Sequence, residues 1–192
     1  DIEIGCGGSV LTLLAAHPGS TVRWVVWSGD AARQAEARAS AADFLAKAGE
    51  RDVRTLGFRE SYFPYGCAAI KAAFEAQADF APDLIFTHRE SDRHQDHRLI
   101  AELTWNTFRN HLILEYEIPK YEGDLGHPNL YVPLDDSVAA RKVEILMGCF
   151  PSQRTRTWFS SELFEAHLRL RGIECNAPSG RAEAFHVRKA IL

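Results

Sequence analysis

Apolar residues follow two different spacings that alternate along the chain. Short, nearly continuous apolar runs predict buried strands, and longer segments with an apolar residue every three or four positions predict helices. The predicted helices cover residues 6–17, 31–48, 67–78, 96–110, 136–149 and 160–171. The predicted strands cover residues 21–27, 53–58, 83–87, 111–116, 130–133 and 184–188, the last as an edge strand. This alternation is typical of βαβ units, so we expect an α/β protein with a Rossmann-like, three-layer α/β/α arrangement and a mostly parallel sheet.

Length and composition are those of one ordinary globular domain. The chain has 192 residues and a formal net charge of −4, so it lacks the basic surface expected of a nucleic-acid-binding protein. No apolar run is long enough for an integral membrane segment and no signal peptide is visible, which favours the cytoplasm. The four cysteines show no Cys-x-x-Cys spacing, so we expect them to be reduced and mostly buried. The oligomeric state has no signature in the sequence.

The strongest chemical signal is His94-Gln95-Asp96-His97, two imidazoles that bracket a carboxylate. The motif follows the predicted strand 83–87 and leads into the helix that starts near residue 96, and this end of a strand is where α/β proteins bind ligands. Imidazole is a common zinc ligand, and a second imidazole can act as acid, base or oxyanion partner. Histidine and aspartate also occur in ordinary loops and helix N-termini, where Asp96 would favour the helix dipole.

The chain starts with Asp1-Ile-Glu-Ile-Gly-Cys-Gly-Gly8, which has no Gly-x-Gly-x-x-Gly spacing and therefore disfavours a nucleotide-binding protein. Together with His94-x-Asp96-His97, this start resembles the LmbE-like, or PIG-L, family of zinc-dependent N-deacetylases. The resemblance extends to Arg33-x-x-Glu36, to the run Pro82–His88, to Ser152-Gln153 and to Ala182–Phe185. A further segment, Ala16-His17-Pro18-Gly19, lacks the family's aspartates and is better explained as a helix end.

The resemblance implies a set of site residues. Asp1 and His97 would bind Zn²⁺, His94 would be a protonated histidine that stabilises the oxyanion or donates to the leaving amine, and Asp96 would orient that imidazole and raise its pKa. Arg33 would reach the sugar or its phosphate. His88 and Asp92 are expected to be rim or scaffold. Because Asp1 corresponds to the last residue of the family's Ala-His-Pro-Asp-Asp segment, we expect a native strand and His-Pro-Asp, with a third ligand and the general base, to precede it.

The resemblance also implies a function. We expect one deacetylase domain over residues 1–192 that removes the N-acetyl group from an N-acetylglucosamine-type moiety of a small-molecule conjugate and releases acetate and a free amine. The aglycone has no signature in the sequence. The alternative is a non-catalytic sugar- or metal-binding member of the same fold.

Overall fold

The computed structural model describes residues 1–190, which form two compact units. The first unit comprises Asp1–Gly57 and Tyr131–Glu183, and the second comprises Phe58–Leu130 with the residues from Ala184 onward. Each unit combines helices with strands, so the prediction of an α/β protein is confirmed.

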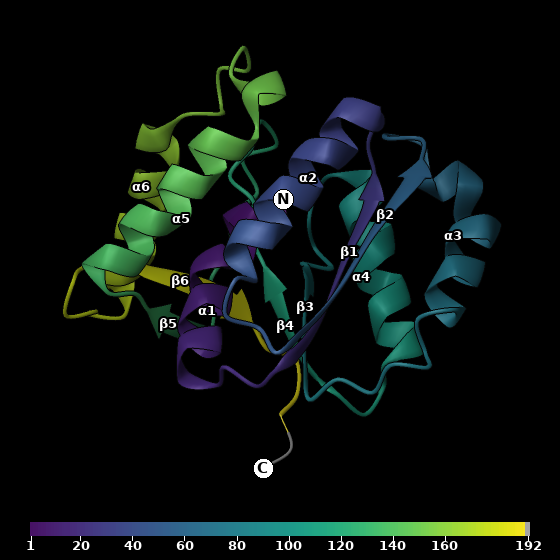
Figure 1. The fold of residues 1–192 in the computed structure, drawn as a ribbon, viewed down its shortest axis with the longest axis horizontal. Helices are drawn as coiled ribbons and strands as arrows, with labels where there is room; N and C mark the ends of the chain where they lie inside the picture. Colours follow the sequence, from purple (N-terminus) through teal and green to yellow (C-terminus); the bar gives the residue numbers. More distant parts are fainter. Residues whose placement is uncertain (191–192) are drawn as a thin grey trace. The chain divides into compact units, whose positions relative to one another are not determined.

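Helices dominate the first unit. They are α1 (Ile2–Ala16), α2 (Ala31–Phe44), α5 (Asp136–Cys149), the short 3-10 helix η2 (Pro151–Gln153) and α6 (Ser161–Glu174). Helix α5 contacts α1, α2 and α6, which Figure 1 shows around it. Two of these helices begin where a side chain caps them: Asp30 accepts from the backbone N–H of Arg33, and Ser160 from that of Leu163. Strands β1 (Thr21–Ser28) and β2 (Glu50–Phe58) form a two-stranded sheet.

The second unit is built around one βαβ connection. Strand β3 (Leu84–His88) runs parallel to β4 (Leu112–Tyr116), in register from Leu84 with Leu112 to His88 with Tyr116. Helix α4 (Gln95–Thr107) joins the two strands and packs on β3 and on α3 (Cys67–Glu75) (Figure 1). The 3-10 helix η1 (Phe63–Gly66) leads directly into α3 and contacts α4.

Strand β6 (Ala182–His186) differs from the prediction. Its residues 185 and 186 pair antiparallel with β4, and β5 (Leu130–Pro133) is its neighbour on the other side. The prediction of an edge strand at 184–188 is therefore wrong. The burial of all four residues from Ala182 to Phe185 agrees with a strand that is covered on both faces.

Several helix boundaries also differ from the prediction, those of α1 and α2 the most. Helix α1 starts at Ile2 rather than near residue 6, and α2 ends at Phe44 rather than at residue 48. All four cysteines are free, as expected, but only Cys6 is buried. Among residues 1–190, no helix has the length and apolar character needed to cross a membrane.

Candidate functional site

The His94–His97 motif lies where β3 gives way to α4 in the second unit. Strand β3 ends at His88, and α4 begins at Gln95 with His94 as its extended N-cap residue. The carboxyl end of a parallel strand and the N-terminus of a helix are the usual places for ligand sites in α/β folds. One βα connection therefore carries three imidazoles: those of His88, His94 and His97.

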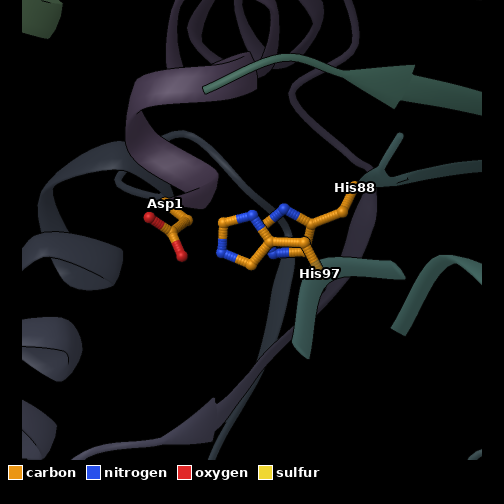
Figure 2. A group of neighbouring side chains, drawn as sticks. All are labelled: Asp1, His88 and His97. Carbon is orange, nitrogen blue, oxygen red and sulfur yellow. The ribbon is translucent and has the colours of Figure 1, made fainter. Parts of the chain in front are cut away.

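These three imidazoles form a cluster. The rings of His88 and His97 are stacked, with centroids 3.8 Å apart and an interplanar angle of 12° (Figure 2). The ring of His94 lies 4.5 Å from that of His97, centroid to centroid. His88 and His97 are buried, whereas His94 is half-buried. His88 is expected from the sequence to be rim or scaffold, but its ring belongs to the cluster because β3 ends next to the start of α4.

Asp92 is the partner of His97. Its Oδ2 lies 3.0 Å from His97 Nδ1 and also accepts from Lys120 Nζ at 3.0 Å, while its Oδ1 accepts from the backbone N–H of His94. Burial alone would raise the pKa of Asp92, but the hydrogen bonds from His97 and Lys120 and the charge of His97 hold it well below its usual range. An ionised carboxylate only accepts, so in the neutral form of His97 the proton lies on Nδ1 and Nε2 is free to bind a metal ion.

His94 contributes a proton donor. Its Nδ1 accepts from the backbone N–H of Asp96 at 3.3 Å, so in the neutral ring the proton lies on Nε2. Burial, and then the charge of His97, lowers the pKa of His94, although Asp96 acts in the opposite direction. This lowering is opposite in direction to the rise in the pKa of His94 that was expected from Asp96.

The Asp96 carboxylate faces a different segment from the one expected. It accepts from the backbone N–H of Ser61 at 2.5 Å and of Phe63 at 3.1 Å, and its neighbour Gln95 donates to the carbonyl of Ser61. The carboxylate of Asp96 therefore fixes the segment before α3, and only the backbone N–H of Asp96 contacts the imidazole of His94. Its place in the first turn of α4 explains this contact, because η1 packs against that helix.

The histidines of this cluster suit a metal ion. His88 Nδ1 is buried and has no hydrogen-bond partner among residues 1–190, and burial followed by the charge of His97 lowers the pKa of His88 well below its usual range. His88 and His97 offer ligand atoms within 4.8 Å of each other. Neutral imidazole nitrogens are the donors that Zn²⁺ prefers, so the residues present fit that ion.

The family of this chain follows from a match to a family profile. The profile of the GlcNAc-PI de-N-acetylase (PIG-L) family matches residues 1–108, more than half of the chain. The chain belongs to the PIG-L family. No curated protein sequence matches it.

Several solved structures share the PIG-L fold of this chain. The conserved protein TT1542 from Thermus thermophilus matches with a TM-score of 0.79 and 19% identity, over 100% of this chain and 91% of its own. N,N′-diacetylchitobiose deacetylase from Pyrococcus horikoshii matches with a TM-score of 0.67 and 18% identity, over 97% of this chain and 79% of its own. The A40926 pseudoaglycone deacetylase Dbv21 matches with a TM-score of 0.65 and 19% identity, over 100% of this chain and 95% of its own. These likenesses confirm the fold of a PIG-L deacetylase.

The other PIG-L residues named from the sequence lie in the first unit. Asp1 directly precedes α1, and its side chain is 42% exposed. Arg33 is half-buried in the first turn of α2. Glu36, one turn later, accepts from both the backbone N–H and the hydroxyl of Ser152, so two of the family elements are joined directly.

The glycine-rich start of this PIG-L chain holds a buried carboxylate. Glu183 accepts from the backbone N–H groups of Gly8 and Ser9 at 2.8 and 2.7 Å, and Lys142 bridges Glu183 and the carbonyl of Ile4, both at 2.6 Å. A Cβ at Gly8 would lie 2.4 Å from Leu134 and 3.0 Å from Glu183. Since a protein carboxylate takes the amide groups that a phosphate would need, the glycines serve packing rather than nucleotide binding.

Proposed function

We propose that the protein uses Zn²⁺ to hydrolyse the N-acetyl group of an N-acetylglucosamine-type saccharide, with release of acetate and a free amine. Membership of the GlcNAc-PI de-N-acetylase family supports the reaction class. The observation that supports a bound metal ion is the buried pair of Asp92 and His97. This pair leaves Nε2 of His97 as a ligand atom beside the neutral ring of His88.

The metal ligands in this proposal are Asp1 and His97, as the family resemblance implies, and His88 offers a further nitrogen donor. Bound zinc lowers the pKa of a water from about 15.7 to about 7 and polarises the substrate carbonyl. Asp92 keeps His97 in the tautomer that can bind the ion.

The remaining site residues act on the substrate. His94 holds its proton on Nε2 and donates it toward the acetamide oxygen or the leaving nitrogen. Asp96 contributes by fixing the start of α4 and the segment that contains Ser61 and Phe63. Arg33 binds a hydroxyl or phosphate oxygen of the conjugate, for which its guanidinium fork is suited.

Zinc content and acetate release, measured together, test these roles. With N-acetylglucosamine and N,N′-diacetylchitobiose as substrates, we expect His97→Ala to lose both zinc and turnover. We expect His94→Ala to keep zinc and to lose turnover by about 10²- to 10⁴-fold, the usual contribution of a general acid or base. The matched control is His17→Ala, because His17 is exposed at the end of α1 and should matter for neither quantity.

The outcomes are distinct. Equal loss of zinc in His94→Ala and His97→Ala would contradict the division of roles, and full turnover in His97→Ala would overturn the metal site. Saccharide binding by the zinc-loaded protein without acetate release would instead favour the non-catalytic alternative.

A further inference from the structure

The second unit has an open groove beside the residues that Asp96 fixes. It is lined by aromatic side chains of the segment from Phe58 to Ile70 and has a free volume of about 210 Å³. Phe63 and Ile70 are buried beneath it, while Tyr62 and Tyr65 are 44% and 81% exposed. Pockets for drug-sized ligands measure roughly 300–1,000 Å³, so this groove suits one ring rather than a whole ligand.

The rim of the groove combines flat aromatic faces with a cation. The rings of Tyr62 and Tyr65 lie 5.9 Å apart, centroid to centroid, and the guanidinium of Arg59 lies 3.5 Å above the ring of Tyr62. Within the part of the chain that the structure describes, no carboxylate pairs with Arg59. Its N–H donors are therefore available to oxygen atoms of a ligand.

Hydrogen bonds connect the backbone of the groove segment to the histidine motif. Asp96 and Gln95, which lie between His94 and His97 in the sequence, together hold the N–H of Ser61, the carbonyl of Ser61 and the N–H of Phe63. Ser61 adopts a left-handed conformation with φ of 65°, which is uncommon for a residue other than glycine. Three hydrogen bonds from one motif to a backbone in this conformation give the aromatic rim a defined position on the unit that carries His94.

We propose that this groove binds a second sugar ring of the substrate, next to the residue that loses its acetyl group. A pyranose has a face of C–H groups that can stack on a tyrosine ring and an edge of hydroxyls that can accept from Arg59. The inference rests on the proposed function for its substrate class, and it makes Tyr65 and Arg59 determinants of specificity for saccharides longer than one residue.

Kinetics with substrates of two lengths test the proposal. For Tyr65→Ala and Arg59→Gln, we expect KM for N,N′-diacetylchitobiose to rise roughly three- to tenfold, the size of one aromatic contact, with kcat unchanged. The kinetics with N-acetylglucosamine should stay as in the wild type. Tyr65→Trp keeps a ring and should restore the low KM, and Ile173→Ala removes another exposed apolar side chain, from α6, and should change nothing.

Direct binding separates this proposal from the proposed function. The disaccharide of glucosamine without acetyl groups cannot be deacetylated, and its Kd can be measured by calorimetry even if the protein hydrolyses none of the substrates. We expect Tyr65→Ala to weaken this Kd roughly three- to tenfold. An unchanged Kd and KM in Tyr65→Ala, or an equal rise in KM for one-ring and two-ring substrates, would overturn the groove as a second subsite.

Discussion

At the scale of single residues, two neighbouring carboxylates have roles that differ from those the sequence suggests. Asp96 stands inside the motif and was expected to orient His94, yet its oxygens accept from backbone N–H groups of Ser61 and Phe63. Asp92 stands outside the motif and was expected to be rim or scaffold, yet it holds His97 at Nδ1. A carboxylate that fixes the tautomer of a metal-binding histidine influences the metal almost as directly as the ligand itself.

The first prediction at this scale concerns Asp92. We expect Asp92→Asn to weaken zinc binding about 10- to 100-fold, because the neutral amide no longer stabilises the Nδ1–H tautomer of His97. Competition with a chromogenic chelator measures the affinity. Asp83→Asn is the matched control, since Asp83 is exposed just before β3. Equal zinc affinity in Asp92→Asn and the wild type would show that His97 needs no carboxylate partner.

The sequence could identify the histidines but not their partners. The spacing of His94 and His97 after a strand-like run is a local pattern, and the structure brings these two rings together. Lys120 contacts Asp92 from 28 residues away along the chain, and Ser61 contacts Asp96 from 35 residues away. Contacts of this kind depend on how loops are packed, so no spacing rule predicts them.

At the scale of elements, helix α1 shows how tertiary contacts override local preference. Gly5, Gly7 and Gly8 lower the helix propensity of this stretch, yet α1 starts at Ile2, before the predicted start near residue 6. The absent side chains instead allow close approach: a Cβ at Gly7 would lie 2.6 Å from Phe44. The ion pair of Lys142 and Glu183 binds the carbonyl and amides of the same turns, so packing and charge hold the start of α1 together.

This arrangement predicts a large effect of Lys142 on stability. Lys142→Met leaves the Glu183 carboxylate buried without its cation, and breaking a buried ion pair in this way costs about 3–5 kcal/mol of unfolding free energy. Urea denaturation measures it. Lys47→Met, at an exposed position after α2, should stay within about 0.5 kcal/mol of the wild type. A loss below about 1 kcal/mol in Lys142→Met would mean that Glu183 is satisfied by the amides of Gly8 and Ser9 alone.

At the scale of the whole molecule, the composition and the alternation of helical and strand patterns were sufficient to predict the fold class. The order of helices and strands was predicted almost completely, and the α/β class and the family are confirmed. The position of β6 in its sheet was not predicted, because strand order is set by pairing between distant segments. The predicted strand 184–188 did not include Glu183, whose buried partner Lys142 lies 41 residues away along the chain.

Zinc should also change the stability of the whole protein. A ligand that binds only the folded state stabilises it by about 2.7 kcal/mol at a concentration of 100 times its Kd, and each kcal/mol shifts Tm by roughly 2–4 °C in a chain of this size. We therefore expect zinc at that excess to raise Tm by roughly 5–11 °C, and a chelator to reverse the shift. Scanning calorimetry at several zinc concentrations measures it, because the shift should grow with the logarithm of free zinc.

The variants make this prediction specific to the histidine cluster. His97→Ala should lose the zinc-dependent shift, since it removes the Nε2 ligand that Asp92 prepares, whereas Tyr65→Ala should keep it in full because Tyr65 lies in the groove and not in the cluster. A shift that survives in His97→Ala would mean that zinc binds elsewhere on the folded protein. No shift in the wild type would argue against a metal-dependent member of the family, whatever the acetate assay shows.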